Sequence, residues 1–133
     1  MKTTKKNFDL FRKECEYWMD EFGLKGWELK CYHTKTKPRN LARTSFNTVQ
    51  RWVCTTLNVD WGKYPTTDYD IKRTAFHEVV EGALLANIRA LAEERYTTQD
   101  QIDEEIHNLV RVLENTVFDK GLRDGHNRSK RSR

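Results

Sequence analysis

Residues 74–81 read Thr74-Ala75-Phe76-His77-Glu78-Val79-Val80-Glu81 and lie in the middle of the longest helical pattern of the chain. Because an α-helix turns by about 100° per residue, His77, Glu78 and Glu81 fall within one sector of roughly 100°. Thr74 shares this sector, and apart from Lys72, Arg73, Asn87 and Arg89 toward the ends, the other positions between 71 and 91 are apolar or small, a pattern typical of a buried helix. Charges in a low-dielectric interior are costly unless they are paired, and a bound metal cation would pair all three groups.

The order His77-Glu78-x-x-Glu81 resembles the HExxH motif of zincin metallopeptidases. In that motif two ligands four residues apart hold zinc, and the glutamate between them activates a water molecule. The resemblance implies that His77 is a metal ligand and that Glu78 is the catalytic general base. Glu81 stands where zincins have their second histidine, so its role as a ligand is a substitution within the motif.

A wider resemblance covers about residues 8–118. It links the chain to the small zincin-like domains of phage and prophage genomes, of the gluzincin type, and more distantly to SprT-like peptidases. The segments that carry this resemblance are Tyr17-Trp18, Phe22-Gly23-Leu24, Trp27-x-Leu29, His77-Glu78 and Val112-Leu113-Glu114-Asn115. The resemblance implies a zinc-dependent peptidase that acts on a peptide or protein substrate. In such families the strand before the active-site helix lies along the cleft and pairs with extended substrate, and by position this strand is Trp52 to Trp61.

A zinc site of this kind needs a third protein ligand from another element and leaves a fourth position for water. In the last helical pattern, Asp103, His107 and Glu114 follow one edge of the apolar stripe. We predict that His107 is the third ligand, because it would supply the second imidazole of a zincin site, which Glu81 does not. Two neutral imidazoles and one carboxylate would leave the zinc site with a formal charge of about +1, so the bound water would stay acidic. Asp103 and Glu104 remain alternatives. Either would neutralise the ion, make its water less acidic and favour harder metals.

The N-terminal part of the chain predicts one helix and up to three strands. Asn7 is expected to cap a helix that ends near Phe22, and residues 27–33 alternate as a half-buried strand does. Residues 41–49 and 52–61 predict two more strands with a hairpin at Gln50-Arg51, although one continuous bent strand fits the same pattern.

Two further helices are predicted after these strands. Thr67 and Asp70 form a capping signal for the central helix, which is expected to reach Leu91 or Glu94, and Gly82 would let another element approach it closely. A second capping box at Thr98 begins a closing helix that reaches about Phe118. Its predicted core stripe is Ile102, Ile106, Leu109, Val110, Leu113 and Val117. The expected class is therefore α+β and zincin-like, with a small antiparallel or mixed sheet of about three strands between an N-terminal helix and the two later helices.

Length and charge indicate a single domain with a basic end. The chain has 133 residues and a formal net charge of +4, and five basic residues fall within the last eleven. We expect one domain over residues 1–120 and a disordered basic tail over residues 121–133. Such a tail can contact nucleic acid, although a basic terminus is more often simply solvated.

The cysteines and the apolar runs favour a cytoplasmic protein. Cys15, Cys31 and Cys54 are an odd set without a C-x-x-C pair, and there is neither a secretory signal nor an apolar run of about 18 residues. We therefore expect a reduced protein that does not contact membranes and that lies in the host cytoplasm if a phage encodes it.

Two functions are compatible with these features. The leading hypothesis is a metal-dependent hydrolase of the zincin type, in which Glu78 deprotonates water and later protonates the leaving amine. The alternative is a zincin scaffold that has lost its chemistry and binds nucleic acid or a host protein, as the substituted motif and the basic tail suggest. An H-E-x-x-E string also occurs by chance on solvated helices, where it forms only i, i+4 pairs.

Overall fold

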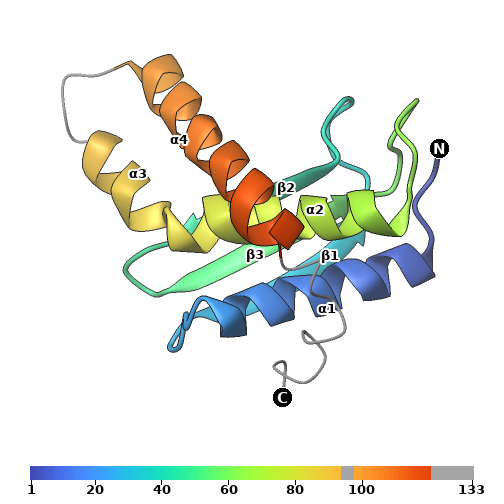
Figure 1. Cartoon of the computed structure of the whole chain (residues 1–133), viewed down its shortest axis with the longest axis horizontal. Helices are drawn as coiled ribbons and strands as arrows, with labels where there is room; N and C mark the ends of the chain where they lie inside the picture. Colours follow the sequence, from blue (N-terminus) through green and yellow to red (C-terminus); the bar gives the residue numbers. More distant parts are fainter. Residues whose placement is uncertain (94–97, 121–133) are drawn as a thin grey trace.

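A three-stranded sheet carries two helices on one of its faces in the computed structural model, which describes residues 1–93 and 98–120 (Figure 1). The elements are α1 (Lys5–Glu21), β1 (Glu28–Thr34), β2 (Ala42–Asn47), β3 (Trp52–Asn58), α2 (Asp68–Val79), α3 (Ala86–Glu93) and α4 (Gln99–Leu113). π-helical turns follow α2 at Val80–Leu84 and α4 at Glu114–Phe118. The predicted α+β class with a small mixed sheet of three strands is confirmed, but the described residues form four α-helices where three were predicted.

The sheet has the strand order β1-β3-β2. β3 pairs in parallel with β1 and antiparallel with β2, so its backbone groups are bonded on both sides. The prediction that residues 52–61 lie along a cleft and pair with substrate is therefore wrong, because a central strand has no free edge. β2 is an edge strand, and it lies beside the end of α2.

The turn between β2 and β3 is the predicted hairpin rather than a bend in one strand. Asn47 Oδ1 accepts a hydrogen bond from Gln50 N at 2.8 Å. Arg51 has a φ of 56°, so an arginine occupies the left-handed conformation that glycine usually supplies in such turns.

The first helix begins earlier than predicted. Thr4 is its N-cap, and Asn7 lies three residues inside as the second half of a capping box. Thr4 Oγ1 accepts from Asn7 N at 3.2 Å, while Asn7 Oδ1 accepts from Thr4 N at 2.9 Å. The prediction assigned the cap to the wrong member of a reciprocal pair.

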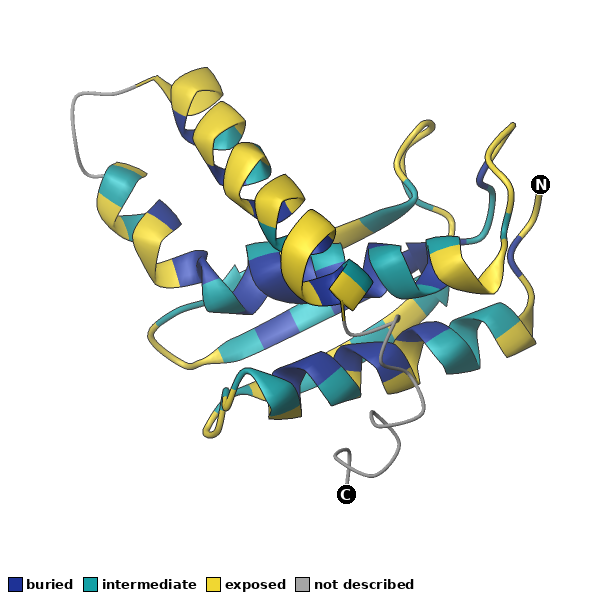
Figure 2. Ribbon diagram, in the orientation of Figure 1, coloured by how far each residue is buried: buried dark blue, intermediate teal, exposed yellow. Residues whose placement is uncertain are grey.

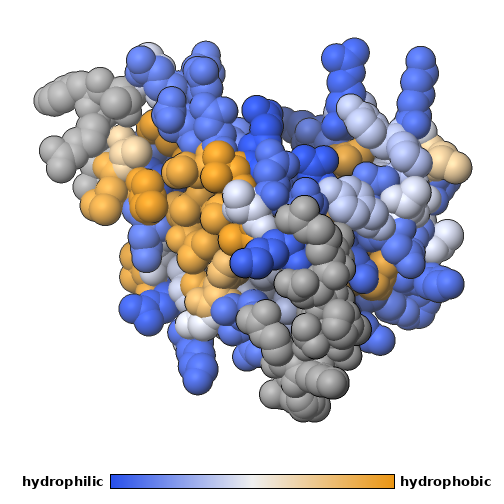
Figure 3. All heavy atoms as spheres, viewed as in Figure 1, coloured by the Kyte–Doolittle hydropathy of each residue, from blue (hydrophilic) through white to orange (hydrophobic). Residues whose placement is uncertain are grey.

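The central helix begins at the predicted cap, Thr67, but does not continue as one α-helix to Leu91. The π-helical turn shifts the helical phase, and the chain then bends at Leu85, where φ is −100° and ψ is 4°. Ile88 and Leu91 consequently face outward, at 53% and 63% exposure. Together with Leu109 of α4, they leave an apolar surface over α3 and the adjoining part of α4 (Figure 3).

The second π-helical turn changes the end of the closing helix in the same way. Val117 was predicted in the core stripe but is 38% exposed, whereas Phe118 is fully buried. A π turn adds a residue to the turn, so the position that meets the core moves on by one. Leu109 also leaves the predicted stripe and is 46% exposed.

The core lies between the sheet and the helices, with α2 at its centre (Figure 2). Trp18 and Phe76 pack edge to face with ring centroids 4.7 Å apart, which joins α1 to α2. Gly82 lies directly against β2 and β3, since a Cβ added there would be 2.5 Å from Thr44 Cγ2 and 2.9 Å from Val53 Cγ2. The predicted close approach at Gly82 is confirmed, and it holds the end of α2 beside the edge strand.

Two other expectations concern the ends and the environment of the chain. The basic tail at residues 121–133 lies outside the described residues, and so does any contact it makes with nucleic acid. Within the described part of the chain, no helix combines the length and the apolar character that crossing a bilayer demands. All three cysteines are free thiols.

Candidate metal centre

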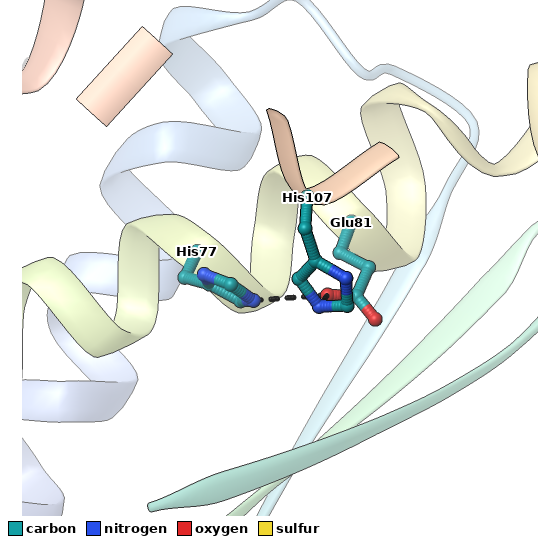
Figure 4. Close-up of side chains that lie close together, drawn as sticks. All are labelled: His77, Glu81 and His107. Carbon is teal, nitrogen blue, oxygen red and sulfur yellow. Dashed lines mark hydrogen bonds and ion pairs between the residues drawn. The ribbon is translucent and has the colours of Figure 1, made fainter. Parts of the chain in front are cut away.

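The three predicted ligands meet at one point between two helices (Figure 4). His77 and Glu81 lie one turn apart, at the end of α2 and in the π-helical turn that follows, and His107 reaches them from α4. Glu81 Oε2 is 2.9 Å from His77 Nε2 and 3.4 Å from His107 Nε2. All three ligand atoms lie within 4.8 Å of one another.

These separations suit a tetrahedral ion. Ligand atoms about 2.0–2.1 Å from a tetrahedral Zn²⁺ are about 3.3 Å from each other. The two distances from Glu81 Oε2 bracket this value, so small side-chain movements would seat an ion among the three atoms. The residues present therefore fit a bound divalent metal.

The alternative third ligands take no part in this cluster. The carboxylate of Asp103 is 2.7 Å from Arg89 Nη1, and Glu104 is exposed on α4. Asp103 still contributes through its backbone, because its carbonyl oxygen is 2.8 Å from His107 Nδ1. A carbonyl only accepts hydrogen bonds, so Nδ1 carries the proton and the Nε2 of a neutral His107 ring is free to bind a metal.

His77 is held by a carboxylate on the side away from the cluster. Its Nδ1 is 3.4 Å from Glu114 Oε2, and the other oxygen of Glu114 accepts from Arg73 Nη2 at 3.3 Å. Glu114 is only 6% exposed. Metal-binding histidines usually donate their second ring N–H to a carboxylate or a carbonyl, which fixes the ring orientation. Both imidazoles of this cluster have such a partner.

The sequence pattern put Glu114 on the same helix edge as Asp103 and His107, but it did not indicate a role for Glu114. The available signal was spacing, since Glu114 is two helical turns beyond His107 and shares its edge of the helix. Arg73 was missed as the partner of Glu114. Arg89 was also missed, although it lies between Asp103 and Glu81, with Nη2 3.9 Å from Glu81 Oε1.

The proposed general base lies beside the cluster. Glu78 is 7% exposed, and its Oε2 is 4.0 Å from His77 Nε2. Burial raises the pKa of Glu78 to about 7, and the charge of Glu81 adds to this, although the charge of His77 opposes it. A base with a pKa near neutral both accepts and returns a proton readily.

His77 is strongly basic when no metal is bound. Burial alone would lower its pKa, but hydrogen bonds to Glu114 and Glu81, with the charge of Glu78, outweigh burial and raise the pKa to about 10. Burial would raise the pKa of Glu81, but its hydrogen bond with His77 holds that pKa below the ordinary value. In the metal-free chain, His77 is thus an imidazolium that donates to a carboxylate from each ring nitrogen.

A cleft of about 540 Å³ opens over the cluster. Its walls come from the loop before β2 and from β2 on one side and from α4 on the other, while α2 contributes His77, Glu78 and the neighbouring Thr74. Thr44 Oγ1 of β2 donates to the backbone carbonyl of Glu78 at 3.4 Å. The edge strand and the candidate metal ligands therefore face the same space.

Comparisons of this chain with protein-family models, with curated proteins and with solved structures found no match. The resemblance to zincins consequently depends on the sequence segments that carry it, above all on the His77-Glu78-x-x-Glu81 motif. The arrangement of His77, Glu81 and His107 is a separate observation that does not depend on any relative.

Proposed function

We propose that this chain is a metal-dependent hydrolase of the zincin type, a peptidase, and that its ion is Zn²⁺. One observation carries the proposal: two imidazole nitrogens and one carboxylate oxygen from two helices converge beside a buried glutamate. Nitrogen-rich sets of this size are typical of catalytic zinc, which keeps one position open. Carboxylate-rich sets would instead suit magnesium or calcium.

Each side chain has a defined role in this proposal. His77, Glu81 and His107 hold the ion, while Glu114 and the carbonyl of Asp103 orient the imidazoles. Bound Zn²⁺ would make a water molecule acidic and polarise the scissile carbonyl group. Glu78 takes the proton from the attacking water and passes it to the leaving nitrogen. The free edge of β2 offers backbone hydrogen bonds to an extended peptide across the cleft.

Metal analysis and a peptidase assay on the same preparations test this function. Protein prepared with zinc and then dialysed should contain about one zinc ion per chain. His77→Ala and His107→Ala should lose the ion, and Glu78→Gln should keep it while peptide hydrolysis falls by about 100-fold or more. The matched control is Glu104→Gln on the exposed side of α4, which should change neither. Metal-free wild-type protein, or a fully active Glu78→Gln variant, would reject the proposal.

A second function is favoured by Glu81, which stands where an active zincin would have histidine. In this version the scaffold keeps the ion for stability and binds nucleic acid or a host protein. Glu78→Gln would then leave binding unchanged, whereas removal of residues 121–133 would weaken binding to DNA and flatten its dependence on salt. An affinity for DNA that does not change with salt concentration would exclude the electrostatic form of this second function.

A further inference from the structure

The cleft over the candidate metal centre has more positive charge than its own acidic groups neutralise. Its lining includes four arginines, Arg39, Arg43, Arg73 and Arg111, and three glutamates, Glu78, Glu81 and Glu114. Arg43 alternates along β2 with Thr44, which faces α2, so its side chain extends over the opposite face of the sheet. The other three arginines balance the three ionised glutamates, and the His77 imidazolium leaves one net positive charge. Zn²⁺ bound in place of the His77 proton would raise the net charge to two. Such a cleft attracts anionic groups and excludes cationic ones.

The glutamates of the cleft are already engaged, whereas most of its arginines are not. Glu81 contacts both imidazoles, and Glu114 contacts His77 and Arg73. Across residues 1–93 and 98–120, by contrast, no carboxylate pairs with Arg39 or Arg111. Two exposed guanidinium groups at one cleft are therefore available to a ligand.

These arginines lie on opposite walls. Arg39 belongs to the loop before β2, while Arg111 lies on α4 one turn beyond His107. Arg39 has a φ of 74°, a left-handed conformation that costs a residue with a side chain about 1–2 kcal/mol. Such strain is concentrated at ligand-binding sites. An extended chain bound beside β2 would have a guanidinium group on each side of the metal centre.

We infer that the substrates are acidic peptides, with aspartate or glutamate side chains flanking the bond that is cut. This inference rests on the proposed peptidase function and deepens it. The substrate carboxylates pair with Arg39 on the β2 wall and with Arg111 on the α4 wall. A guanidinium group matches a carboxylate through two parallel hydrogen bonds, which gives direction as well as attraction.

The composition of the cleft favours a peptide over a nucleic acid. Proteins that bind single-stranded nucleic acid combine basic groups with aromatic side chains on which bases stack. None of the described residues that line this cleft is phenylalanine, tyrosine or tryptophan. The edge strand β2, in contrast, suits a peptide backbone, because it offers hydrogen bonds at the spacing of another strand.

A set of three fluorogenic peptides tests the inference on zinc-loaded, full-length protein. The peptides share one core sequence and differ only in their flanks, which carry glutamate, glutamine or lysine. We expect kcat/KM for the glutamate peptide to exceed that for the glutamine peptide by about fivefold or more, and that for the lysine peptide by a larger factor. Raising the salt from about 50 to about 500 mM should shrink this preference.

Charge variants locate the preference in the cleft. Arg39→Gln and Arg111→Gln should each lower the glutamate-to-glutamine ratio of kcat/KM by about two- to fivefold, and Arg111→Glu should favour the lysine peptide. Lys13→Gln, which removes one charge from exposed α1, is the matched control and should leave the ratio unchanged. The ratio compares two substrates on one preparation, so partial unfolding of a variant does not affect it.

The outcomes separate this inference from the proposed function. Equal cleavage of all three peptides would overturn the inference and leave the peptidase standing. If no peptide is cleaved, the proposed hydrolase has failed, and fluorescence anisotropy then measures binding of the labelled peptides to zinc-loaded Glu78→Gln protein. Tighter binding of the glutamate peptide that depends on the cleft arginines would still support acidic ligands. Equal binding, or displacement of the glutamate peptide by a lower concentration of oligothymidylate, would overturn the inference.

Discussion

His77 is bound by carboxylates at both of its ring nitrogens, Glu81 on one side and Glu114 on the other. This arrangement raises the pKa of His77 to about 10 in the metal-free chain, even though burial acts in the opposite direction. A metal ion must therefore displace the Nε2 proton before it binds. The metal ion and the proton compete for His77 Nε2, so tighter proton binding means weaker apparent metal binding.

Zinc binding should release a proton from His77. At about pH 8, we expect close to one proton per zinc ion, with an apparent association constant that rises about tenfold per pH unit in the range between 6.5 and about 10. Isothermal titration calorimetry in buffers of different ionisation enthalpy measures the number of protons. A binding enthalpy that does not depend on the buffer would show that His77 is not a ligand.

Glu114 should act as a positioning residue for His77. Glu114→Gln keeps the size of the side chain but loses the charge that holds Nδ1–H, so the zinc dissociation constant should rise by about 10- to 100-fold. The same variant should release less than one proton per zinc at about pH 8, because the pKa of His77 falls when a carboxylate partner is removed. Glu104→Gln is the control for a lost charge on α4. A variant with weaker zinc binding but an unchanged proton count would show that Glu114 has a purely structural role.

The π-helical turn Val80–Leu84 joins the site to the sheet. It contains Glu81, a candidate ligand, and Gly82, whose missing side chain lets Thr44 and Val53 approach. π-helical turns within α-helices are often found at functional sites. Here the turn brings the candidate metal ligands next to the edge strand that would hold a substrate.

Gly82→Ala should destabilise the fold even though alanine is the better helix former. An added Cβ would overlap Thr44 Cγ2 and Val53 Cγ2, and we expect the free energy of unfolding to fall by about 1–3 kcal/mol. At an open helical site, the same change would stabilise by about 1 kcal/mol, so the sign of the effect is diagnostic. Urea unfolding measures it, with Asn108→Ala on the exposed face of α4 as a control that should not destabilise. A more stable Gly82→Ala protein would contradict the packing at this position.

The sequence predicted the elements of this fold better than their connections. Caps such as Thr67 and Thr98 are local signals, and both begin helices as expected. The two π-helical turns were not predicted, because they depend on packing between elements and leave no period in the sequence. This is why Val117 was assigned to the core but is exposed, and why Ile88 is exposed on a helix that was expected to be buried. The order of strands was also out of reach, since a central and an edge strand can share one alternating pattern.

In the site, the helical spacing of His77, Glu78 and Glu81 was enough to place them together. His107 was predicted from ligand chemistry and helical phase, and the structure brings it to Glu81. Glu114 could not be assigned, because its contact with His77 depends on how α4 crosses α2. The arginines of the cleft were missed for the same reason, since they come from three separate segments.

For the molecule as a whole, the charges at the centre should make the metal-free chain less stable in alkali. The pKa of His77 rises from an ordinary 6.5 to about 10 on folding, so its contribution is complete below 6.5 and is lost as the pH rises through about 10. The pKa of Glu78 rises from 4.5 to about 7 on folding, so its contribution to the free energy of unfolding is lost as the pH rises from 4.5 to about 7. Both groups therefore make the metal-free chain less stable as the pH rises.

The free energy of unfolding in the presence of a chelator should therefore fall by more than about 1 kcal/mol between about pH 7 and pH 10. Urea titrations at several pH values measure this change. The free energy of unfolding should fall less steeply with pH in His77→Gln, where the titrating imidazole is absent. Excess zinc should raise stability throughout, by about 2.7 kcal/mol at a free concentration of 100 times the dissociation constant. Metal-free protein that becomes more stable over this range would contradict the assigned charges.

Anomalous diffraction at the zinc edge, on crystals of the zinc-loaded chain, tests the metal centre most directly. We predict one strong peak about 2.0–2.2 Å from His77 Nε2, His107 Nε2 and an oxygen of Glu81. Zinc held elsewhere, for instance by the cysteines, or no peak between α2 and α4 in fully loaded crystals, would contradict the metal centre and the hydrolase proposed from it.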